Sequence, residues 1–298
     1  LTIIGTCVVS GVVNDKERQS TDQFLFDLLN HEISAFEFTT LKAVVQDVAW
    51  SKKRLLSRSA RYTGLLDKLD FAETAKGSTL PTADQLEGAT SWVAYVPENH
   101  LATLTEIGTL AASVESLKNV AILLVNANEL EVAASKTALE SLQASAQDAF
   151  LYTVVVVGDM DETTSEGQYY YRYETFGTDE GFLPAETEFS REEAFRMITE
   201  LLQLSCGENK ALCFAPVYNA NRTEARLIKG LRQAGYARPQ EIDHMIREGP
   251  AAYEEYVEKW KNENPDSAKG YTTDLWWLGE EYQESRRRSA AKEAAREQ

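Results

Sequence analysis

Two glycines, Gly5 and Gly11, lie in the stretch where a nucleotide-binding loop would be expected. Residues 1–5, "LTIIG", are predicted to form a buried strand, and residues 21–33 have the apolar spacing of a helix. Between them lies "GTCVVSGVVNDKERQST", which carries Gly5, Thr6 and Gly11. Glycines in such a loop let the backbone approach a pyrophosphate at a helix N-terminus. The stretch lacks the spacing G-x-x-G-x-x-G, so we interpret it as the remnant of a nucleotide-binding loop.

A second candidate site is the acidic stretch 159–193. Its pairs Asp159/Asp161 and Glu192/Glu193 could serve as acid and base or bind a hard cation. The spacing of a calcium loop is missing, so we expect neither catalysis nor a metal site there. The histidines lack the spacing of metal ligands. The cysteines form no CxxC pair, and we predict that all of them are buried free thiols. The residues concerned are His31, His100, His244, Cys7, Cys206 and Cys213.

The negative charge of the chain is concentrated in its first 218 residues. The formal net charge is −17; residues 1–218 hold 16 basic and 32 acidic side chains, and residues 219–298 hold 14 and 15. An acidic body repels phosphate backbones, so we expect no nucleic-acid partner. No run of about 18 apolar residues is present, so we expect no membrane span. The basic end of the chain leaves peripheral association with a membrane open.

Strand-like and helix-like segments alternate along the first two thirds of the chain, which is typical of an α/β protein with a parallel sheet. Strands are predicted at 1–5, 41–47, 69–74, 90–97, 119–127, 151–160 and 210–217, and helices at 21–33, 50–59, 82–88, 101–117, 131–145 and 190–204. The aromatic and acidic stretch from residue 159 onward is interpreted as a loop or hairpin outside the core. Beyond it, helical segments punctuated by Gly and Pro predict two parts, residues 1–218 and a helical extension, 219–298.

Four stretches of the chain carry a family resemblance. They are "LKAVVQDVAWSKKRLL", "LDFAETAKGSTLPTADQLEGATSWVAYV", "SKTALESLQASAQDAFLYTVVVVGDMDE" and "FSREEAFRMITELL". Their order and spacing resemble the atypical, NmrA-like branch of the short-chain dehydrogenase/reductase superfamily over residues 1–217. The resemblance implies a Rossmann-like doubly wound parallel sheet of the kind that binds NAD(P).

The chain departs from that family at the cofactor and catalytic positions. Gln46 stands where NADP-preferring relatives often carry an arginine, and the carboxylate of Asp47 after it could accept a hydrogen bond from a ribose hydroxyl. Lys136 matches the lysine of the catalytic Tyr-x-x-x-Lys pair, but Val132 replaces the tyrosine. Asn126 stands at the end of the fifth strand, where the family has serines.

Further losses lie in the sixth strand and in the glycine loop. Val156 and Val157 stand where the family commonly has Arg and Pro, and Asn128 replaces a second serine. Four departures at the ligand face predict a retained scaffold whose cofactor site is lost. We therefore expect no cofactor and no catalytic residue, with Lys136 as the remaining candidate. If a cofactor binds, the resemblance places NAD(P)H on Gly5, Thr6, Gly11, Asp47, Asn126 and Lys136.

The C-terminal segment has the composition of an arm that binds another protein. "DLWWLGEEY" gathers aromatic side chains within two helical turns, and "RRR" follows it. The usual alternative is that these tryptophans pack back on the domain. The candidate partner-binding residues are Trp276, Trp277, Tyr282, Arg286, Arg287 and Arg288. The tyrosine-rich loop within 159–189 is a second candidate protein interface.

We hypothesise that the chain is a non-catalytic structural, linker or assembly subunit of a larger protein complex. Atypical family members act in chloroplast photosystem biogenesis and in mitochondrial respiratory complex I. That resemblance, with a start at Leu1 that suggests a processed N-terminus, predicts a plastid location, in the chloroplast stroma or on the stromal side of the thylakoid. The mitochondrial matrix and the cytoplasm are the alternatives. The competing hypothesis for function is an NAD(P)H-binding reductase or redox sensor.

Overall fold

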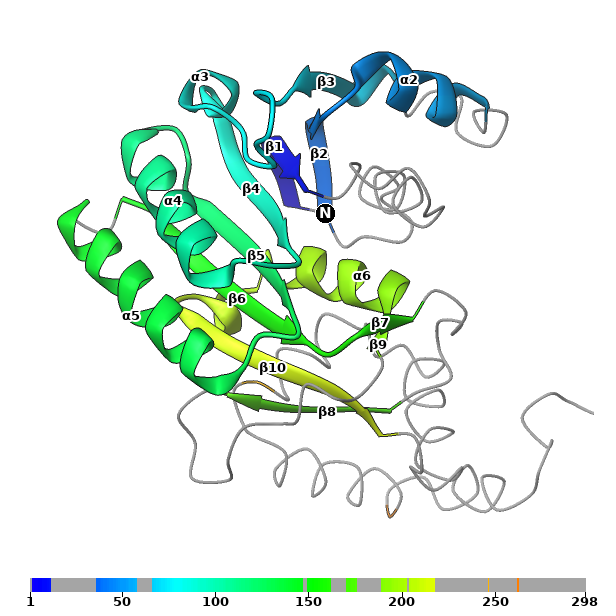
Figure 1. Cartoon of the computed structure of the whole chain (residues 1–298). Coiled ribbons are helices and arrows are strands. Elements are labelled where there is room, and N and C mark those ends of the chain that lie inside the picture. Colours follow the sequence, from blue (N-terminus) through cyan, green and yellow to red (C-terminus); the bar gives the residue numbers. More distant parts are fainter. Residues whose placement is uncertain are drawn as a thin grey trace, which may run out of the picture. The chain divides into compact units, whose positions relative to one another are not determined.

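An eight-stranded sheet forms the centre of the N-terminal part (Figure 1). Its strands lie in the order β3 (Leu69–Glu73), β2 (Phe36–Val45), β1 (Thr2–Ser10), β4 (Ala89–Val96), β5 (Asn119–Val125), β6 (Leu151–Val157), β10 (Lys210–Val217) and β8 (Tyr170–Thr175). The first seven pair in parallel. The chain proceeds from β1 toward one edge and from β4 toward the other, so the predicted Rossmann-like doubly wound sheet is confirmed.

The computed structural model describes residues 2–11, 36–57, 66–146, 149–161, 170–175, 189–202, 204–217, 246 and 262. Contacts divide the chain into two compact units, Leu1–Pro216 and Val217–Gln298. The predicted helix 21–33 lies outside the described residues. So do the six candidate partner-binding residues from Trp276 to Arg288 and nearly all of the predicted helical extension.

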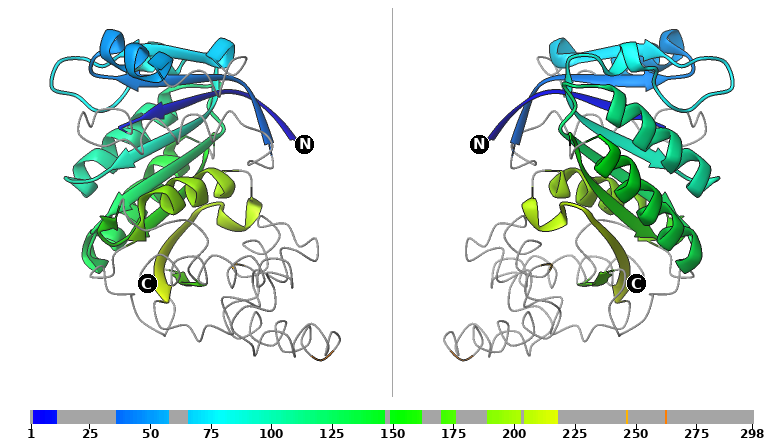
Figure 2. Two further views of the ribbon diagram at one scale, coloured as in Figure 1. Left: turned by 90° about the vertical axis from the view of Figure 1, so that its right-hand side faces the viewer. Right: turned by 90° about the vertical axis from the view of Figure 1, so that its left-hand side faces the viewer.

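Helices cover both faces of the sheet. α4 (His100–Ser113) and α5 (Glu129–Ser145) lie side by side on one face, and α6 (Arg191–Leu201) lies on the other (Figures 1 and 2). α2 (Val48–Ser57) and the one-turn α3 (Ala83–Leu86) flank β3 and β4. The remaining short elements are η2 (Leu66–Lys68), η3 (Ser205–Gly207) and a two-stranded sheet of β7 (Met160–Asp161) and β9 (Phe189–Ser190).

Local sequence explains where several helices begin. The Thr82 side chain accepts from the backbone N–H of Gln85, and the Gln85 side chain accepts from the Thr82 N–H, which is a capping box for α3. Asn128 and Glu131 make the same reciprocal pair at the start of α5. Thr82 and Asn128 are therefore the N-caps of α3 and α5. Each pair satisfies backbone donors that the first helical turn would leave unpaired.

The core runs between the sheet and its helices. β6, with its run of valines, is buried from Tyr152 to Val157, as expected for a strand covered on both faces. The largest fully buried side chain among the described residues is Trp92, whose indole N–H donates to the Ser10 hydroxyl at 2.9 Å. All three cysteines are buried and free, as predicted. No helix in the described part of the chain is both long enough and apolar enough to cross a membrane.

Three predicted boundaries differ from the structure by four residues or more. The first strand extends to Ser10 instead of ending at Gly5, and the second begins at Phe36 instead of residue 41. Val8 and Val9, which we assigned to a loop, are strand residues with 0% exposure. The polar Ser10 beside them masked the strand pattern, because its hydroxyl is satisfied by the indole of the distant Trp92, which no local window contains. The helix predicted at 101–117 ends at Ser113, after which the chain turns into β5.

The stretch after β6 also differs from the prediction. We assigned residues 159–193 to a loop or hairpin outside the core, but Tyr170–Thr175 forms β8, the eighth strand of the main sheet beside β10. The acidic residues around it hid the strand, because hydropathy is averaged over a window that these charges dominate. β8 is an edge strand, and charged residues are common on such edges.

Candidate functional site

The carboxyl ends of β1 and β4 meet at the centre of the sheet, where the strand order reverses. In open α/β sheets, ligands bind in the crevice outside the carboxyl ends of the strands at this switch point. Gly11 directly follows β1, and Pro97 directly follows β4. Asp47, Asn126 and Asp159 follow β2, β5 and β6 at the same edge of the sheet. This edge is the candidate site.

Gly11 is the residue at this edge whose backbone most clearly requires a glycine. Its φ is +81°, a left-handed conformation that side chains disfavour. A Cβ atom at Gly11 would also clash with the backbone carbonyl oxygen of Tyr95 in β4. The end of β1 therefore approaches β4 closely, as the turn after the first strand of a dinucleotide-binding fold does.

Gly5 and Thr6 do not share that position. Both lie inside β1, several residues before its last residue, Ser10. At ~3.3 Å per strand residue, Gly5 and Thr6 are therefore roughly 15 Å from the carboxyl edge of the sheet. A Cβ at Gly5 would lie 3.0 Å from the Thr90 methyl carbon, and the Thr6 carbonyl accepts from the Thr90 hydroxyl at 3.3 Å. Their placement in a loop was wrong, because strand β1 is longer than predicted.

Asp47 lies at the carboxyl edge and caps a helix. Its Oδ1 accepts from the backbone N–H of Trp50 at 2.8 Å, and its carbonyl accepts from Ser51 N–H at 3.0 Å. The side chain thus satisfies an unpaired donor of the first turn of α2. One carboxylate oxygen is used within the fold, which reduces what Asp47 can offer to a ribose hydroxyl.

Asn126 joins the ends of β5 and β6. It adopts a left-handed conformation with φ 55°, its backbone N–H donates to the Val157 carbonyl at 2.9 Å, and its side-chain amide donates to the Asp159 carboxylate. Asn128, two residues on, caps α5. The two asparagines that stand in place of the family's serines are therefore engaged in holding the sheet edge and the helix.

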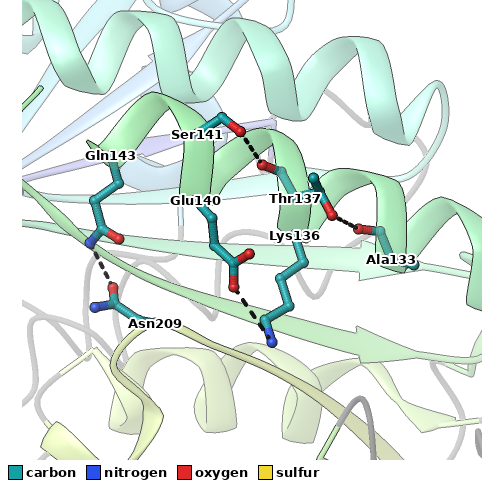
Figure 3. A network of polar contacts seen from close by, with 7 residues as sticks. All are labelled: Ala133, Lys136, Thr137, Glu140, Ser141, Gln143 and Asn209. Carbon is teal, nitrogen blue, oxygen red and sulfur yellow. Dashed lines mark hydrogen bonds and ion pairs between the residues drawn. The ribbon is translucent and has the colours of Figure 1, made fainter. Parts of the chain in front are cut away.

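Lys136 lies in α5 and forms an ion pair with Glu140, with Nζ to Oε1 at 3.6 Å (Figure 3). Four residues earlier, Val132 is 1% exposed and belongs to the hydrophobic core under the helix. An apolar side chain occupies the place where the family has its tyrosine. Lys136 thus has a carboxylate partner in Glu140. On the preceding helical turn, Val132 stands where the Tyr-x-x-x-Lys pair has its tyrosine hydroxyl.

A different tyrosine lies near this ion pair. Tyr152 in β6 is 1% exposed, and its buried hydroxyl lies beside the Glu140 carboxylate of α5. Burial raises the pKa of Tyr152 above its ordinary value, and the negative charge of Glu140 raises that pKa further. A tyrosine that serves as a proton donor and acceptor near neutral pH needs the opposite shift. This cluster therefore disfavours proton transfer.

A hollow of about 660 Å³ opens at the opposite, amino-terminal edge of the sheet. Its lining includes Asp84, Glu87, Glu115 and Lys118. The Lys118 ammonium already donates to the Glu115 carbonyl at 3.0 Å. Within the described ranges, no group of three or more His, Cys, Asp and Glu is placed to hold a metal ion.

The sequence prediction missed the link between Asn126 and Asp159. The signal was present, because each residue closely follows one of two consecutive strands of a parallel sheet. The carboxyl ends of neighbouring parallel strands meet at the same edge, so the two side chains could have been placed together. That Glu140 lies near Tyr152 could not be predicted in this way, because their proximity depends on how α5 packs on β6.

No family model matches this chain, and no curated protein matches it. Solved structures similar to it include a Rossmann-fold NAD(P)-binding family protein from Shigella flexneri, with 11% identity over 72% of this chain and 95% of that chain, and a TM-score of 0.49. A short-chain dehydrogenase/reductase from Veillonella parvula in complex with NADP shows 11% identity over the same shares, with a TM-score of 0.45. A putative NADH-flavin reductase from Streptococcus pneumoniae shows 13% identity over 72% and 99%, with a TM-score of 0.37.

Proposed function

We propose that this chain is a non-catalytic Rossmann-fold subunit that serves as a structural, linker or assembly component of a larger protein complex. The proposal rests mainly on the side chains around Lys136. The lysine pairs with Glu140, and the preceding turn presents Val132 to the core in place of a hydroxyl. Without a hydroxyl of lowered pKa, the Tyr-Lys proton transfer of the family has no donor.

The neighbouring polar groups support the same conclusion. The Tyr152 hydroxyl is buried and its pKa is raised, so it stays protonated where a base is needed. The Asn126 amide is bonded to Asp159, and Asp47 caps α2. These side chains stabilise the fold at the places where relatives place ligand contacts. A fold whose site residues have become structural can still present surfaces to partners.

The test is isolation of the tagged full-length protein from its native source under mild conditions, followed by sizing of the assembly that contains it. We expect a defined complex with constant protein partners. A companion variant that lacks residues 265–298 should lose the complex while its circular dichroism keeps the α/β signal. Recovery of the wild type solely as free protein would contradict the proposal. The plastid setting rests on the family resemblance, and fractionation of the source cells tests it.

A second candidate function, binding of NAD(P)H by a reductase or redox sensor, is favoured by Gly11. Its positive φ and close approach to Tyr95 retain the turn that a pyrophosphate requires. In that case the cofactor would lie over the ends of β1 and β4, and Asp47 would have one carboxylate oxygen left for a ribose. Turnover of NADPH with quinone or flavin acceptors would support this candidate over the first.

A further inference from the structure

β3 is the outermost strand at one edge of the main sheet, beside β2 (Figure 1). The outward backbone groups of an edge strand can pair with a strand of another polypeptide, which leads to aggregation or strand exchange. The sequence of β3, "LDFAE", contains no proline, so its backbone is able to take part in such pairing. What the outward groups of β3 already bond therefore decides whether a further strand can join the sheet here.

The pairing of β3 with β2 fixes which backbone groups point outward. The Thr74 N–H, directly after β3, donates to the Val45 carbonyl of β2 at 2.9 Å. Alternate residues of a strand direct their backbone N–H and C=O groups to opposite sides of the strand. Phe71 and Glu73, three residues and one residue before Thr74, therefore direct theirs away from the sheet.

The outward N–H of Phe71 is capped by the side chain before it. This N–H donates to Oδ1 of Asp70 at 2.8 Å. Asp70 is exposed and belongs to β3 itself, so the donor is satisfied within the strand. An added strand would have to break this charge-assisted hydrogen bond, and it would bring its own carbonyl oxygen toward the Asp70 carboxylate.

The outward carbonyl of Glu73 is capped from α3. The side-chain amide of Gln85 donates to this carbonyl at 2.8 Å. Gln85 also closes the capping box with Thr82, and its backbone carbonyl accepts from the Lys42 ammonium at 3.0 Å. These further bonds hold Gln85 at the end of β3, so its amide stays on the Glu73 carbonyl.

A lysine of α2 lies against the same strand. The Lys52 ammonium is 5.7 Å from the centre of the Phe71 ring, within the range of a cation–π contact. Lysine is a common residue beside edge strands, because pairing with another strand would remove its charge from water. Lys52 therefore adds a desolvation cost to any strand that covers Phe71.

We propose that Asp70 and Gln85, aided by Lys52, close the β3 edge against a strand from another polypeptide. Asp70 occupies an outward donor that an added strand would need, and Gln85 occupies an outward acceptor. A protein partner of this chain then binds it without extending the sheet at β3. The inference goes beyond the proposed function and does not depend on it.

The test combines hydrogen exchange and sedimentation velocity of the full-length protein with those of Asp70→Ala, Asp70→Asn and Asp67→Ala. Asp70→Ala removes the acceptor, so the Phe71 N–H should exchange about tenfold faster, and the variant should associate at concentrations about tenfold lower than the wild type. Adding Gln85→Glu should strengthen this association, because glutamate keeps the capping box but cannot donate to the Glu73 carbonyl. Asp70→Asn keeps a side-chain oxygen for the Phe71 N–H and should behave like the wild type. Asp67→Ala removes an exposed carboxylate of η2, outside the strand, and should do the same.

Three results would overturn the proposal. The first is a Phe71 N–H that exchanges equally fast in the wild type and in Asp70→Ala. The second is an Asp70→Ala/Gln85→Glu variant that associates no more than the wild type. The third is equal association of Asp70→Ala and either Asp70→Asn or Asp67→Ala, which would assign the effect to lost charge. Thermal melting of each variant distinguishes association through the edge from loss of the fold, since Asp67 and Asp70 are exposed.

Discussion

Replacing Gly11 by alanine should destabilise the domain more than replacing Gly77 by alanine. Both glycines have a positive φ, but only Gly11 lies against another part of the backbone. Gly11 has φ +81°, and any Cβ there would clash with the Tyr95 carbonyl oxygen. Gly77 has φ +83°, and a Cβ added to it would meet no described atom within 4 Å. The pair therefore separates the conformational strain, which both share, from the steric contact, which only Gly11 has.

The magnitudes follow from these two terms. A left-handed alanine costs about 1–2 kcal/mol, which is the whole effect expected for Gly77→Ala. Gly11→Ala adds the cost of moving the backbone of β1 away from β4, about 1–3 kcal/mol by comparison with overpacked cores. The total for Gly11→Ala is then about 2–5 kcal/mol.

Urea unfolding followed by tryptophan fluorescence measures the difference, because Trp92 is buried in β4 beside the affected contact. We expect the midpoint to fall further in Gly11→Ala than in Gly77→Ala, with unchanged slopes. Equal midpoints for the two variants would refute the close approach of β1 to β4. They would also remove the strongest structural argument for a retained nucleotide turn.

Three further predictions concern polar groups. Tyr152→Phe should cost about 1 kcal/mol or less at neutral pH, because at most the hydrogen bond of its hydroxyl with Glu140 is lost. Burial and Glu140 raise the folded-state pKa of Tyr152, so the wild type should lose stability as pH rises above about 10, while the variant loses less; thermal melts across roughly pH 7–11 measure this. Gln143→Ala should cost about 2–3 kcal/mol, because its amide donates at 2.8 Å to the side chain of Asn209, and a double-mutant cycle with Asn209→Ala should show coupling. Asp47→Ala should cost about 1 kcal/mol through loss of the α2 cap, while Asp47→Ser should recover most of it in the same unfolding assay.

Much of the fold could be predicted because its strands have clear local patterns. β5 carries the apolar run VAILLV and β6 ends on four consecutive valines, and their bounds were predicted to within a few residues. β1 was cut short because Thr6, Cys7 and Ser10 look polar in a local window. The burial of Cys7 and Ser10 depends on residues far along the chain, such as Trp92, whose indole bonds Ser10, and no local pattern contains them.

The candidate site was predictable only in part. Gly11 and Asp47 were assigned to the carboxyl edge of the sheet, since Gly11 was predicted to follow the first strand and Asp47 to end the second. Gly5 and Thr6 were misplaced with the strand boundary. That Lys136 would pair with Glu140 follows from helical spacing of four residues, and could have been predicted. The raised pKa of Tyr152 required the packing of α5 on β6.

The central proposal is that this Rossmann-like domain binds no nicotinamide cofactor and carries out no chemistry with one. The most direct test titrates NADPH and NADH into the full-length protein while following tryptophan emission, because the Trp92 indole is bonded to Ser10, the residue before Gly11. The account predicts no saturable quenching up to millimolar cofactor and no oxidation of NADPH. Saturable quenching with a micromolar midpoint, lost in Gly11→Ala, would contradict it.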